Sequence, residues 1–204
     1  MYSTLPFFVL GFHGCDKQTK DKVLSGKEKL KHSTNEYDWL GHGIYFWEND
    51  PDRALSYAIS IKEHPERCVN KIEAPAVIGA IIDLKHCLNL FEEKALGYLK
   101  QSYNIFESSI NAYLAGWPKN KSISDEKDVL IRNLDCAVIE TLHSHNKSKG
   151  IKPYDSIRSP FFEGNDLYPN AGFKEKNHIQ LCVINPNCIK GYFDPLEADG
   201  EWPL

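Results

Sequence analysis

The sequence predicts an α+β fold, and three observations lead to this expectation. Short apolar runs typical of buried strands occur at residues 5–12 and 76–84, and residues 178–184 are also predicted to form a strand. Two longer stretches, 93–116 and 125–145, carry apolar residues at the spacing of one helix face. A strand–turn–helix unit lies between the first two strands. Strands and helices mixed in this way along one chain are typical of an α+β domain.

The strand–turn–helix unit is predicted at residues 39–61. The segment Ile44-Tyr45-Phe46-Trp47 has strand composition and is entered through Gly41-His42-Gly43, where glycine permits a tight turn or close approach to a ligand. Asn49-Asp50-Pro51 then supplies a helix cap with proline at the first helical position. Apolar residues continue at helical spacing as far as residue 61.

The remaining elements follow from the same patterns. The run at 5–12 ends at His13 and Gly14, so both are expected at the end of a strand. Residues 154–164 are expected to form a loop, and 188–193 a last strand. The buried helix faces are expected to comprise Leu96, Leu99, Tyr103, Phe106, Ile110 and Leu114 in one helix, and Val129, Leu130, Leu134, Ala137, Val138 and Leu142 in the other.

Length and composition suit a single domain over residues 1–204, with 42% apolar residues available for a core. The net charge of -4 gives no overall attraction to nucleic acid or to an anionic membrane, although a local patch can still bind. The six cysteines form no CxxC pair. The chain also has no secretory leader and no apolar run near the roughly 18 residues of a membrane span. We therefore expect a cytoplasmic protein with no membrane partner.

A lysine-rich segment at residues 17–31 is a candidate basic patch. Its lysines stand at positions 17, 20, 22, 27, 29 and 31, and they outnumber Asp16, Asp21 and Glu28. The segment is either a solvated lysine-rich surface or a contact for a nucleic acid, and the sequence leaves both interpretations open.

The order and spacing of three motifs resemble one known family. Phe12-His13-Gly14 is followed by Gly41-His42-Gly43-Ile44-Tyr45-Phe46, and a strand at Gln180-Leu181-Cys182-Val183-Ile184 lies far downstream. This pattern resembles the PARP-like, diphtheria-toxin-like ADP-ribosyltransferases, whose motif residues are His, Tyr and often Glu. The resemblance implies a split antiparallel β-sheet with flanking helices. It also implies NAD as co-substrate and no metal.

The resemblance assigns roles to individual residues. It implies that His13 hydrogen-bonds the adenosine ribose, that the Gly14 backbone holds the nicotinamide carboxamide, and that Tyr45 stacks on the nicotinamide ring. Gly43 would line the same site. Gln180 would hydrogen-bond the 2′-hydroxyl of the nicotinamide ribose.

Gln180 departs from the family pattern because glutamine carries no charge and cannot take a proton. This departure speaks against polymer formation. Either another group activates the acceptor, with Glu163 as our candidate, or the acceptor needs no activation, or the pocket is inactive. Arg158 is a candidate for binding a phosphate or the acceptor. Arg158 and Glu163 are equally consistent with a structural pair that closes the 154–164 loop.

Other polar residues near the motifs have plainer interpretations. We expect His42 and His178 to be loop or pocket-wall residues, and Asp38 to cap a turn. His143 and His145 lie two apart on a predicted helix and do not suggest a metal site.

The resemblance extends to function. Stand-alone relatives of this size in bacteria are similar to toxins of toxin–antitoxin or anti-phage systems, which act on a macromolecule and are held in check by an inhibitory partner. We therefore expect mono-ADP-ribosylation of a nucleic acid such as mRNA, or of a protein, with nucleic acid slightly ahead. The alternatives are a non-catalytic NAD or ADP-ribose binding module, and an NAD glycohydrolase.

Overall fold

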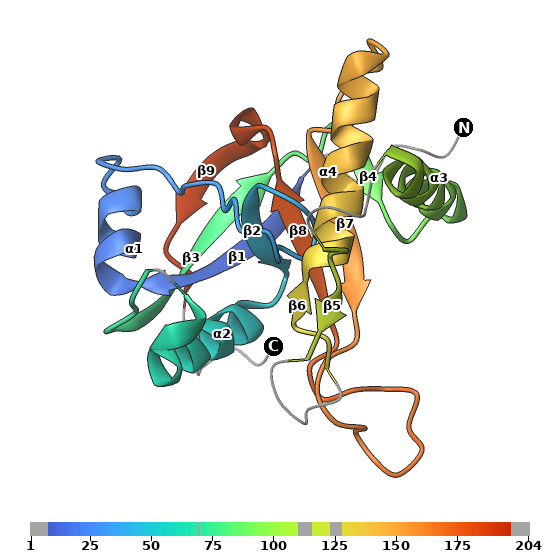
Figure 1. The fold of residues 1–204 in the computed structure, drawn as a ribbon. Coiled ribbons are helices and arrows are strands. Elements are labelled where there is room, and N and C mark those ends of the chain that lie inside the picture. The colour runs from blue at the N-terminus through green and yellow to red at the C-terminus, as the bar shows by residue number, and fades with distance from the viewer. Residues whose placement is uncertain (1–7, 69, 110–115, 123–127, 197–204) are drawn as a thin grey trace. The chain divides into compact units, whose positions relative to one another are not determined.

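The computed structural model describes residues 8–68, 70–109, 116–122 and 128–196 (Figure 1). It contains helices and strands in the mixture that the sequence predicts, which confirms the α+β class. Contacts within the chain divide it into two compact units. Among the described residues, the first unit comprises 31–45 and 84–188, and the second comprises the rest. The single domain over residues 1–204 stays a prediction.

The first unit contains three neighbouring strands of a β-sheet. Its strands lie in the order β4 (Cys87–Asn89), β7 (Ser156–Phe161) and β8 (His178–Val183). β7 and β8 are antiparallel, whereas β4 runs parallel to β7. The expectation of a purely antiparallel sheet is therefore wrong for this pair. The chain reaches β7 from β4 by a long connection that contains two helices, which allows a parallel pairing.

Two helices pack on this sheet. They are α3 (Glu93–Ser109) and α4 (Asn133–Ser148), and their apolar side chains share a core with β4, β7 and β8. The shorter elements of the unit are β5 (Asn120–Lys121), β6 (Ile131–Arg132) and η2 (Pro186–Cys188).

The second unit contains four strands, and all neighbouring strands among them are antiparallel. The order is β2, β1, β3, β9, and the bounds are β2 (Ile44–Glu48), β1 (Val9–Asp16), β3 (Pro75–Ile82) and β9 (Ile189–Phe193). The helical elements are α1 (Lys17–Leu24), α2 (Pro51–Glu63) and η1 (Pro65–Arg67). The chain passes from the first unit into the second within β2, after Tyr45.

The predicted strand–turn–helix unit is confirmed. The side chain of Asp50 accepts the backbone N–H of Arg53 at 2.8 Å, and Pro51 occupies the first helical position of α2. Both features match the predicted cap.

The predicted strand at residues 5–12 is wrong in its position. β1 continues to Asp16 because it pairs with β3 over eight residues, from Val9 opposite Ile82 to Asp16 opposite Pro75. His13 therefore lies inside the strand. The apolar run is also not buried throughout, since Phe8 is 57% exposed. Residues 5–7 lie outside the described part of the chain.

The predicted loop at 154–164 is also wrong. Residues Ser156–Phe161 form β7, which is paired on both sides, and the Ser156 hydroxyl donates to the Leu84 carbonyl oxygen at 2.6 Å. Ser and Pro in this run weaken the sequence signal for a strand. Pairing on two sides outweighs that preference.

The predicted helices shift in their ends and faces. α3 ends at Ser109 and α4 begins at Asn133, while 110–115 and 123–127 lie outside the described residues. α3 buries Ala95, Ser102 and Phe106, whereas the predicted core residue Leu96 is 49% exposed. Val129, assigned to the other buried face, is 37% exposed. Ser102 is buried because its hydroxyl donates to the carbonyl oxygen of Val138 at 2.7 Å.

Candidate active site

The hydroxyl of Tyr45 closes the turn that precedes its strand. It accepts a hydrogen bond from the backbone N–H of Leu40 (2.8 Å) and donates one to the carbonyl oxygen of Gly41 (2.6 Å). Gly41 has a φ of 71°, in the left-handed region that favours glycine. Burial raises the pKa of the Tyr45 phenol well above its ordinary value, because a phenolate there would be poorly solvated. Tyr45 is therefore a neutral residue that fixes the turn, and its ring packs on the core of the first unit.

Gly43 brings this turn into close contact with β8. A Cβ at Gly43 would overlap Cys182 Sγ and lie 2.9 Å from the carbonyl oxygen of Val183. The second glycine of the motif is therefore required for packing in the first unit. Its predicted place in the cofactor site stays a prediction.

Gln180 lies under the same turn. Side chains two residues apart on a strand share a face, so Gln180 shares one with His178 and Cys182. The turn contacts both of these neighbours. The rings of Trp39 and His178 stack with centroids 6.3 Å apart, and Cys182 Sγ is 3.8 Å from the carbonyl oxygen of Gly41. Gln180 stands between the two contacts.

The amide of Gln180 is buried and incompletely bonded. The residue is 7% exposed, and its Oε1 has no hydrogen-bond partner among the described residues. A buried acceptor left without a partner costs about 1–3 kcal/mol. A hydroxyl donor on a ligand would remove that cost, and a ribose hydroxyl is such a donor. The amide therefore fits the NAD ribose that the resemblance implies.

His13 and Gly14 belong to the second unit. His13 stands opposite Ile78 of β3, and its ring centroid is 5.8 Å from that of Phe46. A Cβ at Gly14 would overlap the carbonyl oxygen of Ala54, so this glycine lets α2 lie against β1. The pairing between β1 and β2 covers Gly11 and Phe12 and stops before His13. The NAD contacts assigned to His13 and Gly14 stay predictions.

Arg158 and Glu163 lie on β7 and just beyond it. The guanidinium of Arg158 is 4.5 Å from the ring centroid of Phe91, a cation–π contact. Glu163 is 8% exposed, and its carbonyl oxygen accepts the N–H of Lys176 at 2.9 Å. Glu163 therefore stands at the base of the segment that connects β7 to β8.

This segment, residues 163–176, is a hairpin held by its own hydrogen bonds. Leu167 N–H donates to the Phe173 carbonyl oxygen at 3.0 Å, and Lys174 is paired with Asp166. The segment appears in orange beyond the ends of β7 and β8 in Figure 1. Its exposed apolar side chains are Leu167, Tyr168 and Phe173.

A contact that the sequence does not predict joins the turn to α4. One carboxylate oxygen of Glu140 accepts the backbone N–H of His42 at 2.8 Å, and the other lies 3.5 Å from His42 Nδ1. His42, expected as a loop or wall residue, is thus tied to a carboxylate. No sequence signal marks Glu140, because it is one of several charged residues in a helical pattern.

An aromatic stack adjoins the turn on its other side. The guanidinium of Arg132 lies 4.4 Å from the Trp39 ring centroid and 4.9 Å from that of Phe161. The indole N–H of Trp39 donates to the carbonyl oxygen of Leu130 at 2.8 Å. The stack and the hydrogen bond fix the start of the turn.

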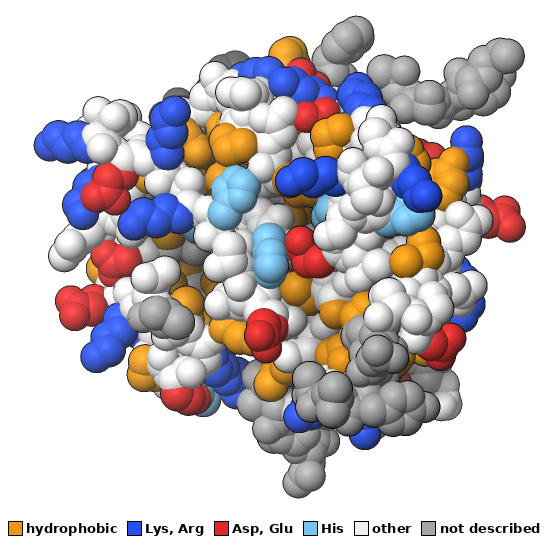
Figure 2. Space-filling view, turned by 45° about the horizontal axis from the view of Figure 1, so that its top comes forward, with side chains coloured by type: hydrophobic (Ala, Val, Ile, Leu, Met, Phe, Trp, Pro, Cys, Tyr) orange, Lys and Arg blue, Asp and Glu red, His pale blue; other side chains and the backbone are white. Residues whose placement is uncertain are grey.

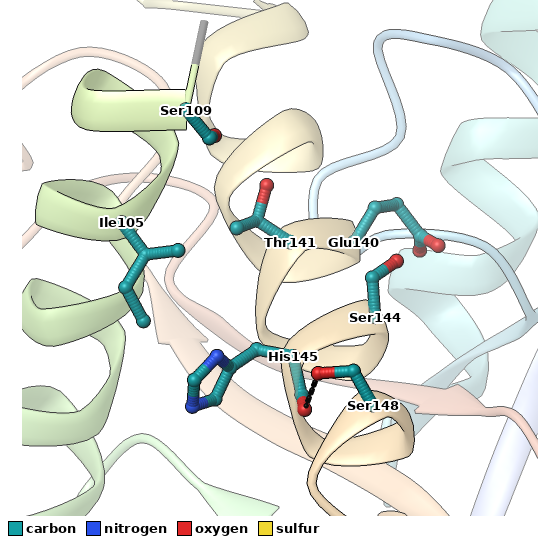
Figure 3. Close-up of a pocket in the computed structure, with 7 residues that line it drawn as sticks. All are labelled: Ile105, Ser109, Glu140, Thr141, Ser144, His145 and Ser148. Atoms are coloured by element: carbon teal, nitrogen blue, oxygen red, sulfur yellow. Dashed lines mark hydrogen bonds between the residues drawn. The ribbon is translucent and has the colours of Figure 1, made fainter.

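A shallow groove runs between α3 and α4, with a volume of about 440 Å³ (Figure 3). Ile105 and Ser109 line it from α3, and Thr141 and His145 from α4. Glu140 also borders the groove, but in Figure 3 its side chain points away from α3. None of the described residues that line this groove has a buried side-chain polar atom without a hydrogen-bond partner, as Gln180 has.

The lysine-rich segment is partly neutralised by ion pairs. Lys17 pairs with Asp21 at 3.2 Å, Lys20 with Asp194 at 2.6 Å and Lys22 with Glu28 at 3.0 Å. Basic and acidic side chains also lie beside one another over the face shown in Figure 2. The pairs weaken the case for a nucleic-acid patch at this segment.

Two further features concern ligands and membranes. Within the described ranges, no group of three or more His, Cys, Asp and Glu side chains could hold a metal ion. None of the helices described is long and apolar enough to cross a membrane. His143 on α4 is half-buried, and desolvation lowers its pKa, with Glu140 opposing this effect.

Comparison with known proteins gives one distant relative. The "Uncharacterized protein MJ0359" of Methanocaldococcus jannaschii is 25% identical to this chain over 194 residues, which covers 88% of the chain and 83% of that protein. No family model and no solved structure matches the chain. The name of that protein states no activity, so the comparison carries no function.

Proposed function

We propose that this chain is an NAD-dependent mono-ADP-ribosyltransferase. The observation that carries the proposal is the buried Oε1 of Gln180, which lacks a partner among the described residues and lies under the turn closed by Tyr45. Support also comes from the order of the His13, Tyr45 and Gln180 motifs.

The reaction breaks the bond between nicotinamide and ribose through an oxocarbenium-like transition state. Such a reaction depends on holding NAD in place and on stabilising charge at the ribose. Gln180 would accept the ribose hydroxyl and so orient the sugar. A neutral amide supports transfer of a single ADP-ribose better than polymer formation, which the resemblance links to a Glu at this position.

We propose a macromolecule as the acceptor, with a nucleic acid such as mRNA ahead of a protein. The support for nucleic acid is the set of exposed lysines after α1 and the guanidinium of Arg158, and the ion pairs of Lys17, Lys20 and Lys22 reduce it. The chain would act in the cytoplasm as a toxin restrained by an inhibitory partner.

Labelled NAD tests the proposal directly. The purified protein is incubated with NAD labelled in its adenylate part and with a bacterial lysate, and the products are then treated with nuclease or protease. We expect label in a macromolecule, released by nuclease if the acceptor is nucleic acid and by protease if it is protein. Tyr45→Ala or His13→Ala should abolish labelling. Gln101→Ala, at an exposed glutamine of α3, should leave it unchanged.

The same experiment separates the rival functions. Free ADP-ribose without labelled macromolecule indicates an NAD glycohydrolase. Bound NAD without nicotinamide release indicates a binding module. Full labelling by Tyr45→Ala would contradict the site assignment.

A further inference from the structure

The contact between His42 and Glu140 has the geometry of an oriented imidazole. The carboxylate accepts the His42 backbone N–H at 2.8 Å and lies 3.5 Å from Nδ1. The hydrogen bond fixes the backbone of His42, and the second contact places the same carboxylate beside the ring. A carboxylate beside Nδ1 favours the tautomer with its proton on that nitrogen, which leaves Nε2 as an acceptor.

The Nε2 atom is available to a ligand. The His42 side chain is 38% exposed, and Nε2 makes no hydrogen bond to another residue in the described part of the chain. Glu140 is also only partly buried, with its side chain 34% exposed. Solvent can therefore accept a proton that reaches His42.

His42 lies close to the candidate site within the first unit. It stands between Gly41, whose carbonyl accepts the Tyr45 hydroxyl, and Gly43, which packs against β8 beside Cys182. Gln180 is two residues from Cys182 on the same face of that strand, about 7 Å along it. The His42 imidazole and the Gln180 amide thus both belong to residues beside the contact between Gly43 and Cys182.

The chemistry of the proposed function calls for a proton acceptor that Gln180 cannot supply. Glu163, the candidate from the sequence, is 8% exposed at the base of the hairpin. We infer that His42, with its ring oriented by Glu140, is the general base that takes the proton from the ADP-ribose acceptor. The inference rests on the proposed function and assigns its base.

The proposed step balances. The acceptor's N–H or O–H group forms a bond to the anomeric carbon of the nicotinamide ribose. The bond from that carbon to nicotinamide breaks, and its electron pair leaves with neutral nicotinamide. The acceptor's proton moves to His42 Nε2 and then to solvent, while the Glu140 carboxylate stabilises the imidazolium through Nδ1.

Two further ionisable groups face His42. His143, one turn beyond Glu140 on α4, has its pKa lowered by desolvation and is therefore neutral near pH 7. Asp38 lies before the turn, and burial raises the pKa of its carboxyl. The Glu140 carboxylate, 3.5 Å from Nδ1, is the acidic group beside the imidazole.

The test is the pH dependence of transfer with three variants. Single-turnover labelling is measured with NAD and the lysate acceptor between pH 5 and 9, beside equilibrium NAD binding and thermal unfolding. In the wild type we expect the rate to rise with pH along an acid limb and then level. His42→Gln should lose this limb and slow transfer by about 10²-fold or more, with NAD affinity little changed.

Glu140→Gln keeps an acceptor for the His42 N–H but loses the charge. Transfer should slow while NAD affinity and the unfolding temperature change little, because the carboxylate that stabilises the imidazolium is gone. The matched control is His32→Gln, an exposed histidine in the same loop, which should behave as the wild type. If His42→Gln unfolds, the transfer rate of Glu140→Gln still decides the question.

The outcomes distinguish this inference from the proposed function. An active wild type, together with an unchanged transfer rate in Glu140→Gln and an unchanged acid limb in folded His42→Gln, overturns the inference alone. A wild type that releases no nicotinamide and labels no acceptor overturns the proposed function and this inference together.

Discussion

The Tyr45 hydroxyl donates to the carbonyl oxygen of Gly41, four positions earlier in the chain, at 2.6 Å. The hydroxyl oxygen of Tyr45 also accepts the Leu40 N–H, so one side chain satisfies two backbone groups of the turn. Tyr45, whose ring is expected to contact nicotinamide, thus also holds the turn together through its hydroxyl.

Tyr45→Phe tests this structural role separately from ring stacking. Phenylalanine keeps the ring but leaves a buried carbonyl oxygen and N–H unpaired, so we expect the free energy of unfolding to fall by about 1–3 kcal/mol. Denaturant unfolding measures the loss, and NAD labelling measures what activity the ring retains. Tyr168→Phe, at a tyrosine that is 55% exposed, is the control and should change stability little.

Gly43→Ala tests the contact of the turn with β8. The new methyl group would overlap Cys182 Sγ and approach the Val183 carbonyl oxygen, and overpacking of this kind costs about 1–3 kcal/mol. Gly97→Ala in α3 is the matched control, because nothing lies within 4 Å of its added Cβ. That control should stabilise the protein by about 0.5–1 kcal/mol, since alanine is the better helix former. Equal effects of the two changes on the unfolding midpoint would contradict the packing argument.

Gln180→Met tests whether the buried amide is kept for a ligand. Methionine has a similar shape and no acceptor to satisfy, so without NAD the variant should be at least as stable as the wild type, by up to about 1–3 kcal/mol. NAD binding, measured by calorimetry, should weaken. A marked loss of stability without NAD would mean that the amide has a structural role. Gln101→Met, on the exposed side of α3, controls for the change of residue type.

Asp16→Asn tests a pH-dependent contribution in the second unit. Asp16 accepts the N–H groups of Gln18, Glu73 and Ala74 at 2.8–2.9 Å. These bonds, led by those from Ala74 and Gln18, lower the pKa of its carboxyl. The native state therefore binds the proton more weakly than the unfolded state.

The ionised Asp16 carboxyl stabilises the folded state at pH values above its pKa in the unfolded chain, which is about 3.9. This stabilisation is lost as the pH falls through the lower pKa of the carboxyl in the folded protein. Asparagine has one acceptor oxygen for these three donors, so we expect Asp16→Asn to reduce the free energy of unfolding by about 1 kcal/mol at pH 7, a value kept low by solvent exposure, and by less at pH 3. Denaturant unfolding at both values checks this. Asp52→Asn, at an exposed aspartate of α2, should show a smaller pH dependence.

The sequence predicts those parts of the fold where local pattern and tertiary pairing agree. β3 and α2 are examples, since an apolar run and a proline cap both match the final structure. β7 is the opposite case, because its pairing on two sides decides its conformation against its composition. Apolar periodicity places Leu96 on the buried face of α3, but Leu96 is exposed and Ser102 is buried instead. Periodicity does not reveal that the Ser102 hydroxyl has a buried acceptor on α4.

The residues of the candidate site also differ in whether the sequence predicts their role. Tyr45 and Gln180 carry motif signals that the sequence discloses. The contact of His42 with Glu140 joins residues 98 positions apart, and nothing local marks either partner. The closeness of Gly43 to Cys182 likewise depends on how the turn lies against a strand formed much later in the chain.

The interleaving of the two units bears on how the protein is synthesised and on which fragments can fold. β9 belongs to the second unit, yet it follows residues 84–188 of the first. During translation, β3 therefore cannot pair with β9 until the whole intervening segment has left the ribosome. A chain cut anywhere between β3 and β9 would leave the β3 edge uncovered, and exposed strand edges promote aggregation. Neither unit can therefore be obtained as a continuous fragment.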